Sequence, residues 1–235
     1  MEDFAAVSGI SRPTLSKYFN DPASVRSSTK ARIEAALEQH DYRPNMYAMN
    51  QNRRLTRNIG IVVPYLADPF FAEIARNIEN LVIEAGYRPI LLSSHGSPDQ
   101  EVENLALLRG IKPSGVLLAP LGRASNVEAL QEYCATFPTV LFDCNIDDLN
   151  LEFVGHNNPQ ATDIIVDYLV RTGEPPVFFE MKNPTNPNAN KRRFAYLETM
   201  ERHGFEATVH SVDGSGWNFE EIGYQQGLKL ISSRK

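Results

Sequence analysis

Residues 11–20, with the sequence SRPTLSKYFN, combine long cationic side chains with short hydroxyl and amide side chains. Arg and Lys can donate hydrogen bonds to guanine in the major groove, whereas Ser, Thr and Asn commonly fix a helix against phosphates. The same composition also suits a helix face that is only solvated. The choice between DNA reading and solvation depends on the elements that surround this segment.

A helix, a tight turn and a second helix are predicted at the start of the chain. Residues 2–8 form the first helix, which Gly9 can end in the left-handed conformation, and Ile10 can fill the space beneath the turn. Ser11 is a suitable N-cap for the second helix, and Pro13 is tolerated in its first turn, where backbone amides are unpaired anyway. This order fits a helix-turn-helix.

A third helix is predicted over residues 27–40, with Ser27 or Ser28 as its N-cap and with Ile33, Ala36 and Leu37 on its inner face. The helix closes at the turn sequence DYRPN. Three short helices suffice for a helix-turn-helix headpiece, and this context favours DNA reading for residues 11–20.

Charge is unevenly distributed along the chain, whose net charge is −6 and whose pI is near 5.4. Residues 1–58 hold nine Lys and Arg against six Asp and Glu, whereas the remainder holds 14 against 23. Because the phosphates of DNA repel acidic proteins, only a basic part of the chain is suited to bind DNA. A small basic module on an acidic body is therefore predicted.

The chain has 235 residues, of which 42% are hydrophobic, so it can fold around a sizeable core. No apolar run is long enough for a membrane span, and MEDFAAVSG lacks the regions of a secretory signal, so we expect a cytoplasmic protein without a membrane partner. Cys134 and Cys144 have no metal-ligand spacing and form no disulfide framework. We expect both to be reduced packing residues.

From residue 58 onward, predicted strands alternate with amphipathic helices, which indicates a parallel α/β sheet. The strands are expected at 59–64, 88–94, 115–120, 139–143 and 152–156, with helices near 69–85, 98–109 and 125–136. A smaller set follows, with helices near 159–172, 190–203 and 219 to the end, and strands at 176–181 and 208–212. Residues from 58 onward are thus predicted to form one complete lobe and the first part of a second.

Catalytic motifs are missing from this sequence. The turn after the first strand reads PYLADPF rather than a glycine-rich fingerprint, and there is no phosphate loop, nucleophile elbow or HExxH. His95, His156 and His203 are isolated, and no cofactor or metal is expected. Two lobes without catalytic groups suggest a cleft that binds a small molecule at the carboxyl ends of parallel strands.

The segments DFAAVSGISRPTLSKYFND, VRSSTKARIEAALEQHDYRPN and NIGIVVP together resemble the lactose-repressor (LacI/GalR) family of transcription regulators, and the likeness continues over nearly the whole chain. The resemblance implies a homodimer whose headpieces bind a pseudo-palindromic operator in double-stranded DNA. It places Arg12, Pro13 and Lys17 at base-reading positions. It places at phosphate-contacting positions Ser11, Thr14, Ser16, Asn20 and Thr29.

A hinge is implied between headpiece and body, where residues 44–58 read PNMYAMNQNRRLTRN. In the family this segment forms a helix that enters the minor groove and wedges a leucine between base pairs. Ala48 and Gln51 are the DNA-contacting candidates, and Gln51 stands at the wedge position. Because glutamine is a poorer apolar wedge, the degree of operator kinking should differ from that in the family.

The body resembles the family's periplasmic-binding-protein-like sensor, which implies a small-molecule effector, a sugar. The implied effector-binding residues are Phe70, Phe71, Asp143, Asn188, Arg192 and Trp217. The alternatives are that the two phenylalanines only pack their helix and that Arg192 belongs to a surface cluster at 191–193. His156 stands where many relatives have Asp, so polar contacts there should differ.

The expected fold is thus an α helix-turn-helix headpiece (1–44), a hinge (45–57) and an α/β, periplasmic-binding-protein-like (type I) sensor. The sensor comprises a first lobe (58–157) with a parallel doubly wound sheet and a second lobe (158–235). The resemblance places the start of the chain inside the family's first helix. We also expect the second lobe to be incomplete by about a hundred residues, with weak effector binding and early proteolysis beyond Asn157.

The predicted function is a non-enzymatic, effector-responsive transcription regulator, a repressor of sugar-uptake or catabolic genes that associates with the nucleoid. The alternative is a cytoplasmic solute-binding protein without a working DNA module.

Overall fold

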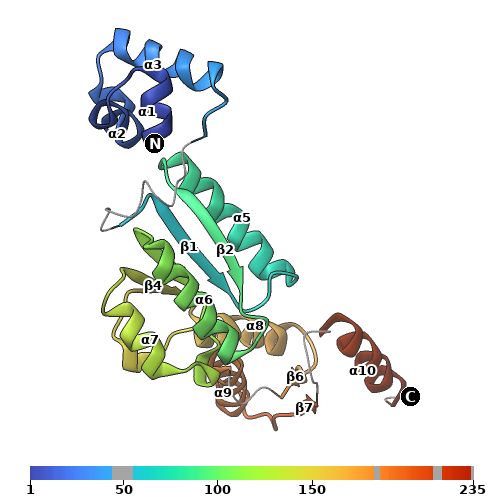
Figure 1. The fold of residues 1–235 in the computed structure, drawn as a ribbon. Helices are drawn as coiled ribbons and strands as arrows, with labels where there is room; N and C mark the ends of the chain where they lie inside the picture. The colour runs from blue at the N-terminus through green and yellow to red at the C-terminus, as the bar shows by residue number, and fades with distance from the viewer. Residues whose placement is uncertain (44–54, 183–185, 214–218, 234–235) are drawn as a thin grey trace. The chain divides into compact units, whose positions relative to one another are not determined.

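The structure is a computed structural model that describes residues 1–43, 55–182, 186–213 and 219–233 (Figure 1). The chain divides into two compact units, Met1–Thr56 and Arg57–Lys235. None of the helices in the described ranges combines the length and hydropathy needed to cross a bilayer.

The first unit is a helix-turn-helix with a third helix, as predicted. Its elements are α1 (Glu2–Ser8), α2 (Arg12–Asn20), the 3-10 turn η1 (Pro22–Ser24) and α3 (Ser27–Gln39). Gly9 ends α1 with a φ of 64°, in the left-handed region that glycine tolerates. The core consists of the buried side chains of Phe4, Ile10, Leu15, Ile33 and Ala36.

The N-cap residue of α2 agrees with the prediction, whereas that of α3 does not. Ser11 is the N-cap residue of α2, but its hydroxyl lies 2.8 Å from that of Thr14 and bonds no backbone amide. Neither Ser27 nor Ser28 caps α3, because the chain enters the helix one residue earlier and Arg26 takes the extended N-cap conformation. The two predicted caps of α3 were therefore wrong, since both serines already have helical backbone.

The second unit opens with a five-stranded parallel sheet in the order β2-β1-β3-β4-β5. Its strands are β1 (Asn58–Val63), β2 (Arg88–Ser93), β3 (Gly115–Leu118), β4 (Thr139–Phe142) and β5 (Phe153–Val154). The parallel α/β prediction is confirmed, although β5 pairs over two residues where five were expected.

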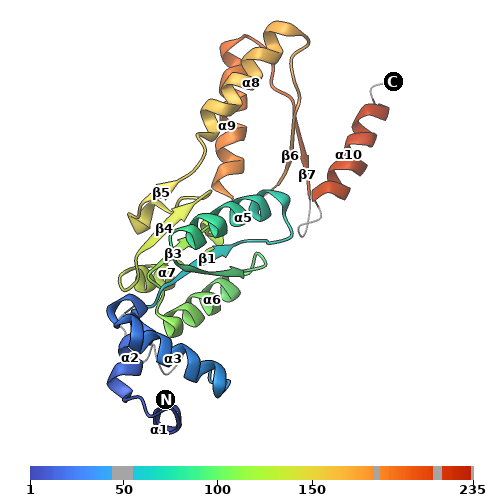
Figure 2. The ribbon, with the colours of Figure 1, turned by 90° about the horizontal axis from the view of Figure 1, so that it is seen from above.

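Helices cover both faces of this sheet (Figure 2). On one face, α5 (Pro69–Glu84) buries Phe71 against Ile61, Val63 and Phe142. On the other face, α6 (Pro98–Ile111) and α7 (Val127–Cys134) pack Leu108 and other apolar side chains against the strands. The 3-10 turns η2 (Gly122–Ala124) and η3 (Asp147–Leu149) follow β3 and β4. The sheet is doubly wound, as predicted.

The rest of the second unit consists of α8 (Asn158–Thr172), β6 (Phe178–Met181), α9 (Pro187–Arg202), β7 (Val209–Val212) and α10 (Phe219–Ser233). β6 and β7 form a parallel pair, and α8 lies side by side with α9 (Figure 2). Val166, Tyr196 and Met200 form the core, and the Tyr196 hydroxyl donates to the carbonyl oxygen of Pro176 at 2.9 Å. All five elements were predicted.

Candidate DNA-binding face and small-molecule cavity

The predicted DNA contacts of residues 11–20 lie together on α2 and its N-cap. Leu15 is fully buried and holds this helix on the headpiece core, which leaves the opposite side of α2 to solvent. The exposed members are Ser11, Arg12, Pro13, Lys17 and Asn20, while Thr14 and Ser16 are half-buried. Thr29 is half-buried in the first turn of α3. Most of the predicted contact residues are thus accessible to solvent, and their contacts with DNA stay predictions.

Two cations on this face differ in their partners. Lys17 is exposed, and no carboxylate in the described part of the chain lies within ion-pair distance of its ammonium group. Arg12 instead forms an ion pair with Glu2 of α1. Both retain donors suited to phosphate or to guanine edges.

Three predicted site residues lie outside the described residues. Ala48 and Gln51 belong to the hinge segment, and Trp217 belongs to the segment before α10. Their roles stay predictions.

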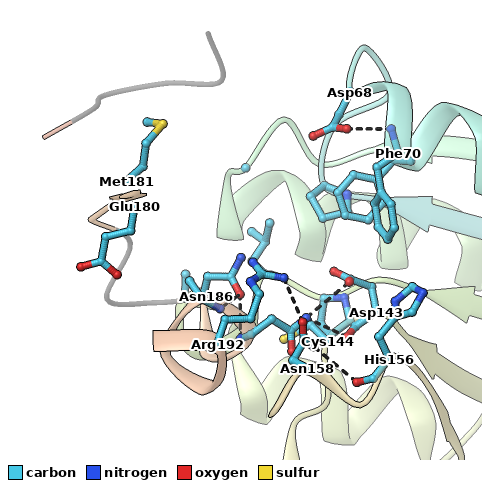
Figure 3. Close-up of a pocket in the computed structure, with 18 of the residues that line it drawn as sticks. Asp68, Phe70, Asp143, Cys144, His156, Asn158, Glu180, Met181, Asn186 and Arg192 are labelled. Atoms are coloured by element: carbon cyan, nitrogen blue, oxygen red, sulfur yellow. Dashed lines mark hydrogen bonds between the residues drawn. The ribbon is translucent and has the colours of Figure 1, made fainter. Parts of the chain in front are cut away.

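A cavity of about 700 Å³ opens at the carboxyl ends of the parallel strands (Figure 3). One wall is made by residues that follow β1 to β5, including Pro64, Gly96, Leu121, Asp143 and His156. The opposite wall is made by β6, by Lys182 and Asn186, and by residues near the starts of α8 and α9. This location is the usual one for ligands in open α/β sheets, and the volume suits a small molecule.

The predicted aromatic residues line this cavity, but in different ways. Phe71 is 6% exposed and belongs mainly to the core beneath α5, so it both packs the helix and closes the cavity. Phe70 is 40% exposed, and its ring lies edge-on to Phe71 and 6.2 Å from the His156 ring. Asp68 caps α5 by accepting the Phe70 amide at 2.8 Å, which fixes the start of this helix.

Asp143 and Asn188 join the two walls of the cavity. Asn188 Nδ2 donates to the Asp143 carbonyl oxygen at 2.9 Å and to its carboxylate at 3.3 Å. Asp143 takes a φ of 62°, a left-handed conformation that turns the chain after β4. Burial raises the pKa of the Asp143 carboxyl above its ordinary value, and the neighbouring Arg192 and His156 act in the opposite direction.

Arg192 lies at the cavity on α9, and its side chain is exposed. Nη1 donates to Asn158 Oδ1 at 2.9 Å, which holds the side chain by the first turn of α8 (Figure 3). A guanidinium has five N–H donors, so most of them stay available to a ligand. Arg192 lines the cavity, whereas its neighbours Lys191 and Arg193 do not, and its contact with an effector stays a prediction.

Several cavity residues were missed in the sequence. They are Asp68, Cys144, Asn158, Glu180, Lys182 and Asn186. All of them lie at or after the end of a predicted strand or near the start of a predicted helix. Ligands bind at the carboxyl edge of such a sheet, so this position in the sequence could have indicated that they line the cavity. Two are already paired, since Glu180 bonds Arg193 and Lys182 lies 3.1 Å from Asp213.

Cys144 also lines the cavity, as a weakly acidic thiol. Cys144 is a free thiol, and burial, followed by the nearby Asp143, raises its pKa to about 12. A thiol with so high a pKa is not a nucleophile at neutral pH. No group of three or more metal-ligating side chains occurs within the described ranges.

Glu101 is a buried carboxyl, bonded to a cavity-lining residue, that was also missed in the sequence. It is 0% exposed, and Oε1 accepts the amide of Leu121, a cavity-lining residue, at 3.1 Å. No hydrogen-bond partner within the described chain reaches Oε2. Glu101 shares the inner face of α6 with Leu105 and Leu108, and a polar residue in that apolar stripe was the signal for it.

Glu101→Gln is expected to change how stability depends on pH. Burial raises the pKa of Glu101 above its ordinary value, more than hydrogen bonds from Ser125 and Leu121 lower it. The folded protein therefore holds this proton more tightly than the unfolded chain. The protonated Glu101 carboxyl therefore contributes to the free energy of unfolding at low pH. This contribution is lost as the pH rises from the pKa of Glu101 in the unfolded chain through its pKa in the folded protein.

Urea unfolding followed by circular dichroism should therefore show the stability of Glu101→Gln, relative to the parent, increasing with pH above the ordinary carboxyl range. Glu103→Gln is the matched control, because Glu103 is exposed on the same helix and the same charge is removed. A pH dependence identical in both variants would show that Glu101 is not the responsible group.

Comparison with known proteins matches two family models to this chain. Residues 1–45 match the bacterial regulatory proteins of the lacI family, and residues 56–215 match the periplasmic binding proteins and sugar binding domain of the LacI family. The PtxS transcriptional regulator of Pseudomonas aeruginosa is 30% identical over 171 residues, which are 72% of this chain and 49% of that protein. The ribose operon repressor of Escherichia coli is 26% identical over 87% of this chain and 62% of its own.

Solved structures share the fold. The lac repressor dimer bound to operator and an anti-inducer superposes with a TM-score of 0.77 at 20% identity, over 98% of this chain and 69% of that one. The CelR transcriptional regulator in complex with cellobiose gives 0.56 at 22% identity, over 90% of this chain and 65% of that one. The chain spans about half to two thirds of the length of the curated relatives it matches. The two family models, which together cover most of its residues, show that the chain belongs to the LacI family of bacterial regulatory proteins.

Proposed function

We propose that this chain is a sequence-specific DNA-binding transcription regulator, a repressor, that responds to a small-molecule effector. The observation that carries the proposal is the presence, in one chain of this family, of an exposed polar face on α2 and a cavity at the carboxyl ends of a parallel sheet. The partner is double-stranded operator DNA, which places the protein on the nucleoid in the cytoplasm. No catalytic step is involved.

In this proposal the headpiece (1–44) and hinge (45–57) bind DNA, and the lobes at 58–157 and 158–235 hold the effector. Arg12, Pro13 and Lys17 read bases, while Ser11, Thr14, Ser16, Asn20 and Thr29 contact phosphates. Ala48 and Gln51 contact the minor groove. A homodimer places two headpieces on a pseudo-palindromic operator, so two modestly basic modules bind the same DNA. The acidic remainder of the chain need not approach the phosphates.

The effector in this proposal is a sugar. Asp143, Asn188 and Arg192 offer acceptors and donors for hydroxyl groups, and Phe70 offers an exposed ring face. Trp217 is proposed as a second aromatic contact. The name of the ribose operon repressor and the cellobiose in the CelR complex support this class of ligand.

Selection of bound fragments from the source genome tests the proposal. The full-length protein should retain fragments that share a symmetric motif upstream of genes, and deleting its gene should raise transcription of those genes. A panel of sugars, added to the bound fragments, should include one that changes their retention. Retention of random fragments only, with saturable sugar binding, would favour the alternative of a solute-binding protein without a working DNA module.

Lys17→Ala and Arg12→Ala are each expected to weaken binding to the selected fragment by about 1–3 kcal/mol per contacted guanine. Affinity for random DNA should change much less, because only a base contact distinguishes the two. Fluorescence anisotropy with both duplexes measures the ratio. The assignment of α2 as the base-reading helix is wrong if both variants discriminate as well as the parent.

A further inference from the structure

An ion pair joins α1 to α2 at the proposed DNA-binding face. Arg12 Nη1 donates to Glu2 Oε1, and the two residues are the first of their respective helices. Both side chains are largely exposed, Arg12 at 59% and Glu2 at 75%. Lys17, the other cation proposed to read a base, has no ion pair within the described chain. Arg12 therefore has an acidic neighbour that Lys17 lacks.

The headpiece core fixes the positions of these two residues. Glu2 and Arg12 are ten residues apart, and the chain between them turns once, at Gly9 with a φ of 64°. Phe4 on α1 and Leu15 on α2 are both buried in the same core cluster, so the crossing of the two helices is set by packing. Packing of the headpiece core thus brings together the two helix starts that carry the carboxylate and the guanidinium.

This contact leaves Arg12 able to read a base. A guanidinium presents five N–H donors in a planar fork, and the carboxylate takes a donor on Nη1. The other donors can still bind O6 and N7 of a guanine. A carboxylate that fixes the plane of the fork also reduces the rotamer freedom that Arg12 must lose when it binds.

We propose that Glu2 is a positioning residue that orients Arg12 toward one base pair of each half-site and thereby determines the base preference there. The inference rests on the proposed DNA-binding function. The Glu2 carboxylate also repels phosphate, because it adds a negative charge to the face that meets DNA. Glu2 should therefore have two effects of opposite sign: it raises selectivity at one base pair and lowers affinity for DNA of any sequence.

Enrichment from a library of DNA duplexes, each with a randomised centre about two helical turns long, tests this proposal. The full-length parent is compared with Arg12→Ala, Glu2→Gln and Glu2→Ala. Asp3→Asn is the matched control, because Asp3 is exposed in the same first turn of α1 and has no ion pair among the described residues. Glu2→Gln and Asp3→Asn remove the same charge, so only the contact with Arg12 distinguishes them.

Arg12→Ala should remove the preference at one base pair of each half-site and so identify it. Glu2→Gln and Glu2→Ala should lower the preference at that base pair by about two- to fivefold, the range of an exposed ion pair, and leave the other positions unchanged. Asp3→Asn should keep the preference. Anisotropy with a duplex that the library does not enrich should show raised affinity for Glu2→Gln and Asp3→Asn alike.

Two results would overturn the role of Glu2 while leaving the proposed function intact. One is an unchanged preference at the Arg12 base pair in both Glu2 variants. The other is an equal loss at all positions, which would indicate a damaged headpiece. An Arg12→Ala variant that keeps every preference of the parent would likewise overturn this inference alone, whereas a parent that enriches no motif would overturn the proposed function and this inference with it.

Discussion

Leu15→Ala is expected to unfold the headpiece and abolish DNA binding while the sheet of the second unit stays folded. Leu15 is fully buried in a cluster of five buried side chains, and a Leu to Ala change in such a core costs about 2–5 kcal/mol. A domain with so small a core has a low free energy of unfolding, so this cost is a large fraction of it. The two compact units have separate cores, which confines the effect.

Amide hydrogen exchange with mass spectrometry distinguishes the two units. Peptides from residues 1–43 should lose protection in Leu15→Ala, and peptides from β1, β3 and α6 should keep it. Val7→Ala is the control, because Val7 is an apolar residue of α1 that is 60% exposed, and its truncation should cost less than about 0.5 kcal/mol. Parental protection and DNA binding in Leu15→Ala would show that the headpiece core is assigned incorrectly.

Arg192→Ala is expected to weaken sugar binding by about 10- to 100-fold, since a hydrogen bond from a charged group contributes about 1.5–3 kcal/mol. The side chain lies at the cavity, bonded to Asn158, with further donors available. Folding should be unaffected, because Arg192 is exposed and has no carboxylate partner within ion-pair distance in the described part of the chain.

Calorimetry with a panel of sugars, on the full-length gene product, measures this effect. Lys191→Ala is the matched control, because the same charge is removed one residue earlier on α9, where the side chain does not line the cavity. Equal losses in both variants would indicate a general effect of charge. Parental affinity in Arg192→Ala would place the sugar site elsewhere.

The sequence allowed the order of helices and strands to be predicted because their signals are local. Apolar runs such as those of β1 and β3 are bounded by breakers, and Gly9 and Gly86 take the left-handed conformations that end helices. The effector candidates Phe70, Phe71, Asp143, Asn188 and Arg192 all line the cavity. These came from resemblance to a family, since nothing local to those residues indicates that they meet.

What could not be predicted depends mainly on contacts between distant segments. The pairing of Asn188 with Asp143 joins residues 45 positions apart, and that of Arg192 with Asn158 joins residues 34 apart. The ion pair of Glu2 with Arg12 depends on the angle at which two helices cross.

The N-cap of α3 was predicted wrongly for a local reason, although the helix begins at Ser27 as expected. Serine is strongly preferred at an N-cap, so the pair of serines at 27 and 28 was the strongest signal for the cap. Arg26 has the N-cap conformation instead, and no side chain caps this helix. Local propensity therefore placed the N-cap one or two residues too late.

We propose above all that the exposed face of α2 reads DNA sequence as part of a symmetric dimer. Enrichment from the randomised duplex library with the unmodified full-length protein tests it most directly. We expect a motif of two inverted half-sites whose centres lie about 10 base pairs, or a multiple of that, apart. Enrichment of no motif, or of a single motif without two-fold symmetry, would contradict it.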